Sequence, residues 1–266
     1  MDLHILNGGI GKQIMFTSVL DKLDKKICVT TVWDKLFLNH PMIEGVYPDI
    51  GWGAYDMKKF YDNFENIIYI EPYFGNFCKN KQHLIEAFHE KLNLPCDELY
   101  HTITFSDKEE RYYSKFLQEL DDFVLVQFTG SDRDLNKDLN QIGGRNLELD
   151  TAQEVINILS RDMGMKIIDV NNGDAQFQNT FVPRIVPQYR DYLIMTKYCK
   201  SFISIDSCLN HMSAFKNTPK KGVCLWRDAE YGKLFEYNHN INLYSELPIK
   251  MKFKAKNIVD SLLESY

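Results

Sequence analysis

The sequence predicts an α/β protein of two domains, each built on a parallel β-sheet with helices on both faces. Three observations predict this class. A chain of 266 residues suits one large domain or two of about 100 to 150 residues each. Short apolar strands alternate with amphipathic helices, which is typical of parallel sheets. The alternation runs twice, and the second run begins near residue 121.

The first 120 residues predict strands and helices in alternation. Apolar runs, one of them β-branched, indicate strands at residues 3–6, 27–32, 45–47 and 67–70. Apolar residues at helical spacing indicate helices at residues 13–23, 82–92 and 107–120. The last of these helices follows Ser106, which forms a capping-box pattern with Glu109.

The second run of strands and helices follows the same pattern. Apolar runs indicate strands at residues 123–128, 165–170, 202–205 and 222–225, and a polar loop covers residues 129–144. Helices are expected after the caps Asp150 and Thr151, at 189–200, at 209–215 and at 257–263. The last helix carries Ile258, Val259 and Leu262, so it needs a surface on which to dock.

Composition excludes several classes of protein. With 44% hydrophobic and 26% charged residues, the chain is neither disordered nor collagen-like nor a coiled coil. Its apolar runs are far shorter than the roughly 20 residues of a membrane span, and the start lacks the basic region of a signal peptide, so we expect a cytoplasmic protein. The six cysteines form no CxxC pair, which argues against a zinc ribbon or a disulfide scaffold.

Charge is unevenly distributed along the chain. Residues 1–180 hold 18 basic and 29 acidic side chains, whereas residues 181–266 hold 13 basic and 8 acidic ones. This asymmetry predicts that an anionic partner meets the C-terminal third of the chain. The alternative is that these charges only solvate the surface.

A glycine turn follows the first predicted strand. Gly8, Gly9 and Gly11 resemble part of a dinucleotide fingerprint, but Ile14 stands where its third glycine belongs. A P-loop is excluded because Gln13 follows Lys12. The turn at a helix N-terminus could approach an anion or a sugar closely, or it could simply join strand to helix.

A second motif lies after the strand at residues 202–205. Asp206 ends that strand, and Ser207, Asn210 and His211 lie in the first turns of the next helix. In an open parallel sheet, ligands bind at the carboxyl ends of the strands, so we expect Asp206 and His211 to point into a cleft. The alternatives are a capping role at the helix start and a hydrogen-bonded histidine in the core.

These residues resemble a known family. Residues 203–214 are similar to the D-[TS]-G-x-x-H-[LM]-[AS]-A signature of the ADP-heptose:lipopolysaccharide heptosyltransferase family. The turn at residues 9–11, the segment 39–46 and the loop that starts at Gln127 are similar to that family's opening turn, its N-P-x-I-D-x-V segment and its phosphate loop. The resemblance covers residues 1–50 and 120–226.

The resemblance implies a fold and a division of labour. It implies two Rossmann-like domains that face a cleft, the glycosyltransferase B fold, with an acceptor domain at residues 1–120 and a nucleotide-sugar domain at residues 121–248. Residues 249–266 would form a helix that packs back on the first domain. The activity implied is sugar transfer from a nucleotide-diphosphate sugar to a hydroxyl group.

Two positions depart from the family pattern and affect catalysis. The family's opening aspartate, thought to be the catalytic base, falls on Lys12, and Cys208 replaces the signature glycine. Lys12 suits neutralisation of phosphate. We expect the base to be Glu71, because Pro72 ends its strand and leaves the carboxylate at the edge of the cleft, or alternatively Asp34.

Donor binding is expected to use the loops after the strands of the second domain, together with the glycine turn of the first domain. The candidate residues are Gly9, Gly11, Thr129, Ser131, Arg133, Arg145, Asn171, Asp206, Ser207, Asn210 and His211. Asp132 and Asp134 have DxD spacing, but Arg133 lies between them, which favours a surface role. We therefore expect no metal and no cofactor besides the nucleotide-sugar co-substrate, with basic side chains and helix dipoles facing the diphosphate.

The acceptor is left open between two classes. A bacterial surface glycan is what the resemblance implies, and a hydroxymethylated pyrimidine of phage DNA is the other candidate. Lys250, Lys252, Lys254 and Lys256 alternate with apolar residues, a stripe that would attract phosphates of either acceptor or simply form a solvated linker. A different reading, a nucleotide-sugar binding or scaffold protein without catalysis, also fits the loss of the aspartate. The sugar, the nucleotide, the stereochemistry and the oligomeric state stay undetermined.

Overall fold

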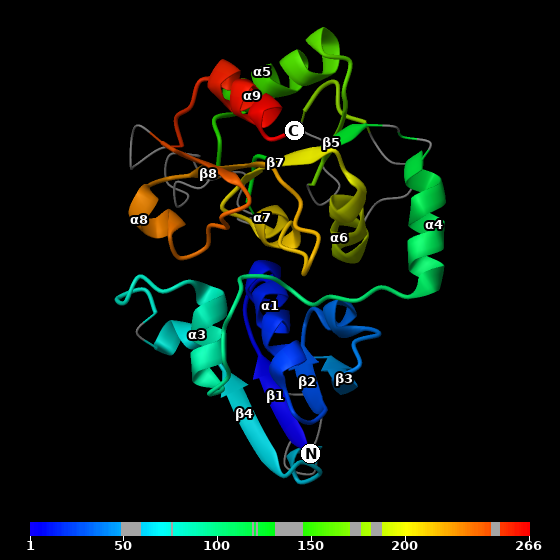
Figure 1. Ribbon diagram of the computed structural model, residues 1–266, viewed down its shortest axis with the longest axis vertical. Coiled ribbons are helices and arrows are strands. Elements are labelled where there is room, and N and C mark those ends of the chain that lie inside the picture. The colour runs from blue at the N-terminus through cyan, green and yellow to red at the C-terminus, as the bar shows by residue number, and fades with distance from the viewer. Residues whose placement is uncertain are drawn as a thin grey trace. The chain divides into compact units, whose positions relative to one another are not determined.

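The computed structural model divides the chain into two compact units, Met1–Asp107 and Lys108–Tyr266 (Figure 1). The structure describes residues 1–48, 60–75, 77–118, 120, 122–130, 146–170, 177–181, 188–245 and 251–266. Within these ranges no helix has the length and apolar character needed to cross a membrane. The two units are described separately below.

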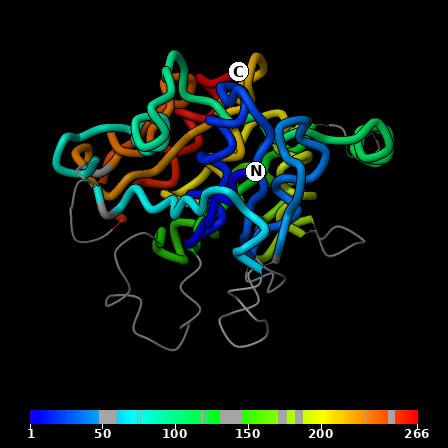
Figure 2. Tube along the Cα trace, turned by 90° about the horizontal axis from the view of Figure 1, so that it is seen from below, coloured from blue at the N-terminus to red at the C-terminus, as the bar shows by residue number. Residues whose placement is uncertain are grey.

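The first unit is built on a four-stranded parallel sheet with the strand order β3-β2-β1-β4. Its strands are β1 (Asp2–Leu6), β2 (Ile27–Thr31), β3 (Ile43–Pro48) and β4 (Asn66–Ile70). Its helical segments are α1 (Ile10–Phe16), η1 (Thr17–Lys22), η2 (Asp34–Phe37), η3 (Pro72–Phe74) and α3 (Leu84–Lys91). The path of this unit, blue to cyan, can be followed in Figure 2. All four predicted strands are confirmed to within about two residues.

The helix predicted at residues 13–23 differs from the structure. It begins at Ile10 and changes at Thr17 from an α-helix to the 3₁₀ segment η1. The Thr17 hydroxyl donates to the Ile14 carbonyl at 2.7 Å and accepts the Thr102 amide at 3.1 Å, and the Thr102 hydroxyl donates to the Thr17 carbonyl. These bonds engage backbone carbonyls that would otherwise continue the α-helix.

The second unit is built on a five-stranded parallel sheet with the order β6-β5-β7-β8-β9. Its strands are β5 (Phe123–Gln127), β6 (Lys166–Asp169), β7 (Ser201–Ile205), β8 (Val223–Trp226) and β9 (Ile241–Tyr244). Its helical segments are α4 (Asp107–Gln118), α5 (Leu149–Asn157), η4 (Ile158–Asp162), α6 (Tyr189–Tyr198), α7 (Cys208–Met212), α8 (Ala229–Gly232) and α9 (Ala255–Glu264). Figure 1 shows α5 and α9 on one side of this sheet and α6 and α7 on the other.

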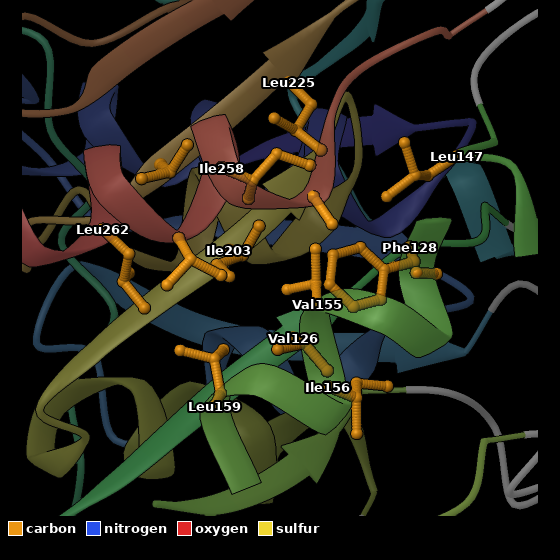
Figure 3. Packing of buried hydrophobic residues seen from close by; sticks show 14 of the residues in the cluster. Val126, Phe128, Leu147, Val155, Ile156, Leu159, Ile203, Leu225, Ile258 and Leu262 are labelled. Carbon is orange, nitrogen blue, oxygen red and sulfur yellow. The ribbon is translucent and has the colours of Figure 1, made fainter. Parts of the chain in front are cut away.

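The side chains of the central strands explain these layers. In β5 every residue is buried, and alternate residues face opposite sides of the sheet. Val126 and Ile203 pack with Val155 of α5 and Ile258 of α9 in one apolar cluster (Figure 3). This cluster is the core of the second unit.

The last helix was expected to pack on the first domain, and the structure places it elsewhere. Ile258, Val259 and Leu262 are at most 4% exposed and belong to the core of the second unit. The apolar stripe of α9 lies against α5. The helix therefore docks on the face of the second sheet that α5 also covers.

Helix α4 also belongs to the second unit, so the units divide at Asp107/Lys108 rather than near residue 121. The Arg190 guanidinium holds both oxygens of Glu109, at 2.6 and 3.2 Å. Lys197 binds Glu110 at 2.5 Å, and the Tyr113 hydroxyl donates to Asp191. These polar contacts hold α4 against α6, which sequence periodicity does not reveal.

The position of α9 generates a stability prediction. We expect Ile258→Ala to lower the free energy of unfolding by about 2–5 kcal/mol, because it opens a cavity in the core of the second unit. Lys256→Ala, at an exposed position of the same helix, should change it by less than about 0.5 kcal/mol. Urea unfolding measures both, and hydrogen exchange should rise at the amides of β7 and β8. Faster exchange confined to β1 and β2 would contradict this placement.

Candidate functional site

Each sheet has one point where the order of its strands reverses. In the first unit the chain moves from β1 to β2 and β3 on one side, and β4 lies on the other side of β1. In the second unit β6 and β7 flank β5 on opposite sides. The two connections leave the sheet in opposite directions at such a point, and open α/β sheets bind ligands there, at the carboxyl ends of the strands. The residues after β1 and β4, and after β5 and β7, are therefore the candidate sites.

The glycine turn after β1 allows a lysine to fold back over it. Gly8 has φ +94°, a conformation that favours glycine, and a Cβ built on Gly8 would lie 2.5 Å from Lys12 Cε. The Gly8 carbonyl accepts a hydrogen bond from the Trp33 indole at 3.1 Å. Any other residue at position 8 would displace Lys12, so this glycine is required by the turn and by the lysine that covers it.

Lys12 forms an ion pair with Glu71 at the first switch point. Lys12 Nζ lies 2.6 Å from Glu71 Oε2, and the two side chains are only 9% and 11% exposed. The other oxygen, Oε1, accepts the Tyr73 amide at 3.2 Å. The Tyr73 ring centroid lies 5.3 Å from Lys12 Nζ, within the range of a cation–π contact. Glu71 thus has one carboxylate oxygen on a lysine and one on a backbone N–H.

A hydrogen-bonded layer beneath the turn fixes its backbone. The Gln13 side chain donates to the Leu6 carbonyl at 3.2 Å and accepts the Thr31 hydroxyl. Both Gln13 and Thr31 are buried. They connect the ends of β1 and β2 to the start of α1, so the turn that carries Lys12 is held from below.

The remaining predicted residues of the first unit are Gly9, Gly11 and Asp34, and their surroundings differ from those of Lys12 and Glu71. Gly9 is extended and precedes the first residue of α1, and a Cβ there would meet nothing within 4 Å. Gly11 lies inside α1. Asp34 is exposed at the start of η2, after β2. The structure therefore brings Glu71 to Lys12 and leaves Asp34 one strand away from the switch point.

The second switch point is organised by Gln127 at the end of β5. Its side-chain oxygen accepts the Leu209 amide at 3.0 Å, and the Cys208 thiol lies 3.6 Å away. This contact joins the end of β5 to the start of α7. Burial is the main cause that raises the pKa of the Cys208 thiol, which keeps it uncharged at neutral pH.

The described residues on either side of positions 131–145 are hydrogen-bonded to one another. The Gly130 amide donates to Asn146 Oδ1 at 2.7 Å, and the Leu147 amide donates to the Phe128 carbonyl at 3.0 Å. Gly130 and Asn146 are thereby held at the carboxyl end of β5, where Thr129 is half-buried. The predicted donor residues Ser131, Arg133, Arg145 and Asn171 lie outside the described residues.

The motif after β7 divides into two settings. Asp206 lies at the carboxyl end of β7 and is 7% exposed, and Ser207, partly exposed, precedes α7 without a side-chain capping bond. This part of the motif lies at the switch point of the second sheet. Helix α7 has only five residues, so it supplies much less of a dipole than a full helix.

Asn210 was expected to bind the donor at a helix N-terminus and His211 to point into a cleft, and the structure buries both. Asn210 is fully buried and donates to the Phe235 carbonyl at 3.0 Å, while its oxygen accepts from Asn240 at 3.2 Å. His211 Nδ1 lies 3.1 Å from the Tyr237 hydroxyl. The short α7 turns these side chains toward the segment before β9, so the alternative of a hydrogen-bonded core histidine describes His211.

Four residues that sequence reasoning missed shape the two switch points: Trp33, Tyr73, Gln127 and Asn146. Gln127 was seen only within the predicted strand 123–128 and at the start of the loop that resembles the family's phosphate loop, with no role of its own. A polar residue that ends an otherwise continuous apolar strand is a signal that could have found it. Asn146 follows Arg145 after a long polar segment, and nothing in its immediate sequence indicates that it bonds to Gly130.

The described residues contain no cluster of side chains suited to bind a metal ion. No group of three or more His, Cys, Asp or Glu side chains among those residues is placed to hold a metal ion. Asp132 and Asp134, the pair with DxD spacing, lie outside the described residues. In the first unit the described residues offer a carboxylate paired with a lysine. In the second unit they offer polar side chains at the carboxyl ends of β5 and β7.

Comparisons with known proteins identify the fold. No protein-family model matches the sequence, and no curated protein matches it. Solved structures do: a glycosyl transferase family 9 protein from Veillonella parvula, with a TM-score of 0.70 and 10% identity over 99% of this chain and 96% of that one. The E. coli heptosyltransferase WaaC with ADP gives 0.66 and 11% over 100% and 99%, and E. coli ADP-heptose lipopolysaccharide heptosyltransferase II gives 0.64 and 13% over 99% and 98%. The chain thus has, over its whole length, the two-sheet α/β fold of these glycosyltransferases.

Proposed function

We propose that this protein is a glycosyltransferase that moves a sugar from a nucleotide-diphosphate sugar to a hydroxyl acceptor. The observation that carries the proposal is the Glu71 carboxylate, held at the switch point of the first sheet in a chain whose fold matches glycosyltransferases from end to end. Sugar transfer needs a base for the acceptor hydroxyl and a site for the departing diphosphate. The two switch points supply one candidate for each task.

The second unit is the proposed donor site. Its switch point gathers Thr129, the base of the loop between Gly130 and Asn146, and the Asp206–Ser207 turn. That loop carries Arg133 and Arg145 in sequence, and guanidinium groups bind phosphate bidentately. The matching structure of WaaC was solved with ADP, which supports a nucleoside diphosphate as the leaving group here.

Glu71 is the proposed general base. In the reaction the acceptor oxygen forms a bond to the anomeric carbon while the bond from that carbon to the diphosphate oxygen breaks. The acceptor proton passes to the Glu71 carboxylate, and the electron pair of the broken bond leaves with the nucleoside diphosphate. Asp34 is the alternative acid; it is exposed after β2, away from the paired strands β1 and β4. We propose that protein cations rather than a metal ion stabilise the leaving diphosphate.

The acceptor is proposed to be a glycan, with a hydroxymethylated pyrimidine of DNA as the second candidate. Residues 1–107 hold 15 acidic and 10 basic side chains, a balance that disfavours a DNA backbone on the proposed acceptor unit. The observation that favours DNA is the exposure of Lys252, Lys254 and Lys256. A DNA acceptor would bind with a steep salt dependence, of about −0.9 in log K per phosphate contacted, whereas a neutral glycan would not.

The role of Glu71 generates the main activity prediction. We expect Glu71→Gln to lower kcat by about 10²- to 10⁴-fold, because the amide cannot accept the acceptor proton. Donor binding should stay within a small factor of wild type. Asp34→Asn is the matched control and should retain activity. Loss of turnover in Asp34→Asn together with retention in Glu71→Gln would show that Asp34 is the base.

A thermal-shift series with nucleoside diphosphates tests the donor site. A nucleotide at 100 times its Kd should stabilise the folded chain by about 2.7 kcal/mol, since it binds only the native state. Ser207→Ala should reduce the shift, whereas Ser245→Ala, in the loop after β9, should not. If a nucleotide binds but no nucleotide sugar is turned over, the protein is the binding or scaffold protein of the alternative hypothesis. The absence of a shift with every nucleotide would overturn the proposed function.

A further inference from the structure

The surroundings of Lys12 differ from those expected of a phosphate ligand. As an isolated ammonium in the first turn of α1 it would be expected to face the donor diphosphate. In the structure its charge lies 2.6 Å from a carboxylate, and the side chain is 9% exposed. A cation already neutralised by a close carboxylate attracts phosphate weakly. The ligand of Lys12 is therefore already present within the first unit.

The surroundings of Lys12 are built to hold it on Glu71. The absence of a Cβ at Gly8 leaves room for the lysine side chain, because a Cβ there would lie 2.6 Å from Nζ. The Tyr73 ring covers the ammonium from 5.3 Å, and the Tyr73 amide binds the second oxygen of Glu71. Three features thus fix the Glu71 carboxylate in one orientation: the glycine at position 8, the Tyr73 ring and the Tyr73 backbone N–H.

We infer that Lys12 is a positioning residue for Glu71, and that the two side chains act as one unit rather than as a phosphate ligand and a separate base. The inference rests on the proposed function. The chain places a lysine on α1 and delivers the carboxylate from the loop after β4, 59 residues later in the sequence. The Lys12 ammonium holds the Glu71 carboxylate in one orientation for the acceptor hydroxyl, so its effect is on the chemical step and not on donor affinity.

Steady-state kinetics separates the two roles of Lys12. With Lys12→Met we expect kcat to fall about 10- to 100-fold, the cost of a misplaced catalytic group, while the Kd for ADP is unchanged. Lys12→Arg should recover part of the activity, because a guanidinium can also hold the carboxylate. Lys25→Met is the matched control, since Lys25 pairs with Asp2 at 3.0 Å on the same unit, and it should behave as wild type. If Lys12→Met weakens ADP binding more than adenosine binding and leaves kcat unchanged, Lys12 is a phosphate ligand and the inference is wrong.

A charge exchange tests whether the pair acts as a unit. Lys12→Glu alone places two carboxylates together, and Glu71→Lys alone places two ammonium groups together. The double variant Lys12→Glu/Glu71→Lys restores one of each, with the carboxylate now carried by α1. We expect it to turn over faster than either single variant. Activity of the double variant at or below that of the worse single variant would contradict the inference.

Amine acylation gives a readout that does not depend on turnover. Lys12 should react with an acylating reagent more slowly than the exposed Lys25 and Lys26 in the wild-type chain, and Glu71→Gln should raise its labelling severalfold, as followed by mass spectrometry. Equal labelling of Lys12 in both proteins would show that the pair does not form. If the pair forms but the wild type transfers no sugar from any donor that it binds, the proposed function fails, and the positioning role fails with it.

Discussion

The first sheet depends on one constraint, the parallel pairing of β1 with β4 on the side opposite β2. This pairing aligns Leu6 with Ile70, so the residues that follow the two strands start from the same edge. Glu71 and Lys12 are far apart in the sequence, and only this register brings their side chains together. The glycine turn, the buried Gln13–Thr31 contact and the Tyr73 ring all support the meeting point that the register creates.

The second sheet uses the same arrangement with different chemistry. β5 and β7 pair so that Gln127 lies opposite Ser204, and the Gln127 amide then reaches the first residues of α7. The described side chains at this edge are amide, hydroxyl and carboxyl groups. The first sheet therefore presents a carboxylate paired with a lysine, and the second presents polar side chains at the ends of β5 and β7. These are the proposed acceptor site and the proposed donor site.

Sequence patterns predicted most of this fold because strand and helix periods are local. The apolar runs at residues 123–128 and 202–205 correspond closely to β5 and β7, and the pattern at residues 189–200 to α6. The short β9 was missed because Ile241 and Leu243 alternate with polar residues over only four positions. The place of α9 was missed because an apolar stripe shows that a helix docks, but not on which surface.

The site was predicted in part for the same reason. The sequence placed Glu71 and Asp206 directly after strands, and the structure has them after β4 and β7, while Lys12 lies in α1. The burial of Asn210 was not predicted, and a core position for His211 was only the alternative, because both depend on Phe235, Tyr237 and Asn240, which come after the next strand. Nor could the sequence show that Lys12 and Glu71 pair, since that contact depends on the order of strands in the sheet.

Chemical rescue measures the central claim, that Glu71 supplies the carboxylate for the reaction beside Lys12. In Glu71→Ala the truncated side chain leaves space next to the Lys12 ammonium, where a small anion such as formate can bind. We predict that added formate restores part of the lost turnover in Glu71→Ala, in a saturable manner, and has no effect on wild type. Rescue of Asp34→Ala but not of Glu71→Ala would contradict the account.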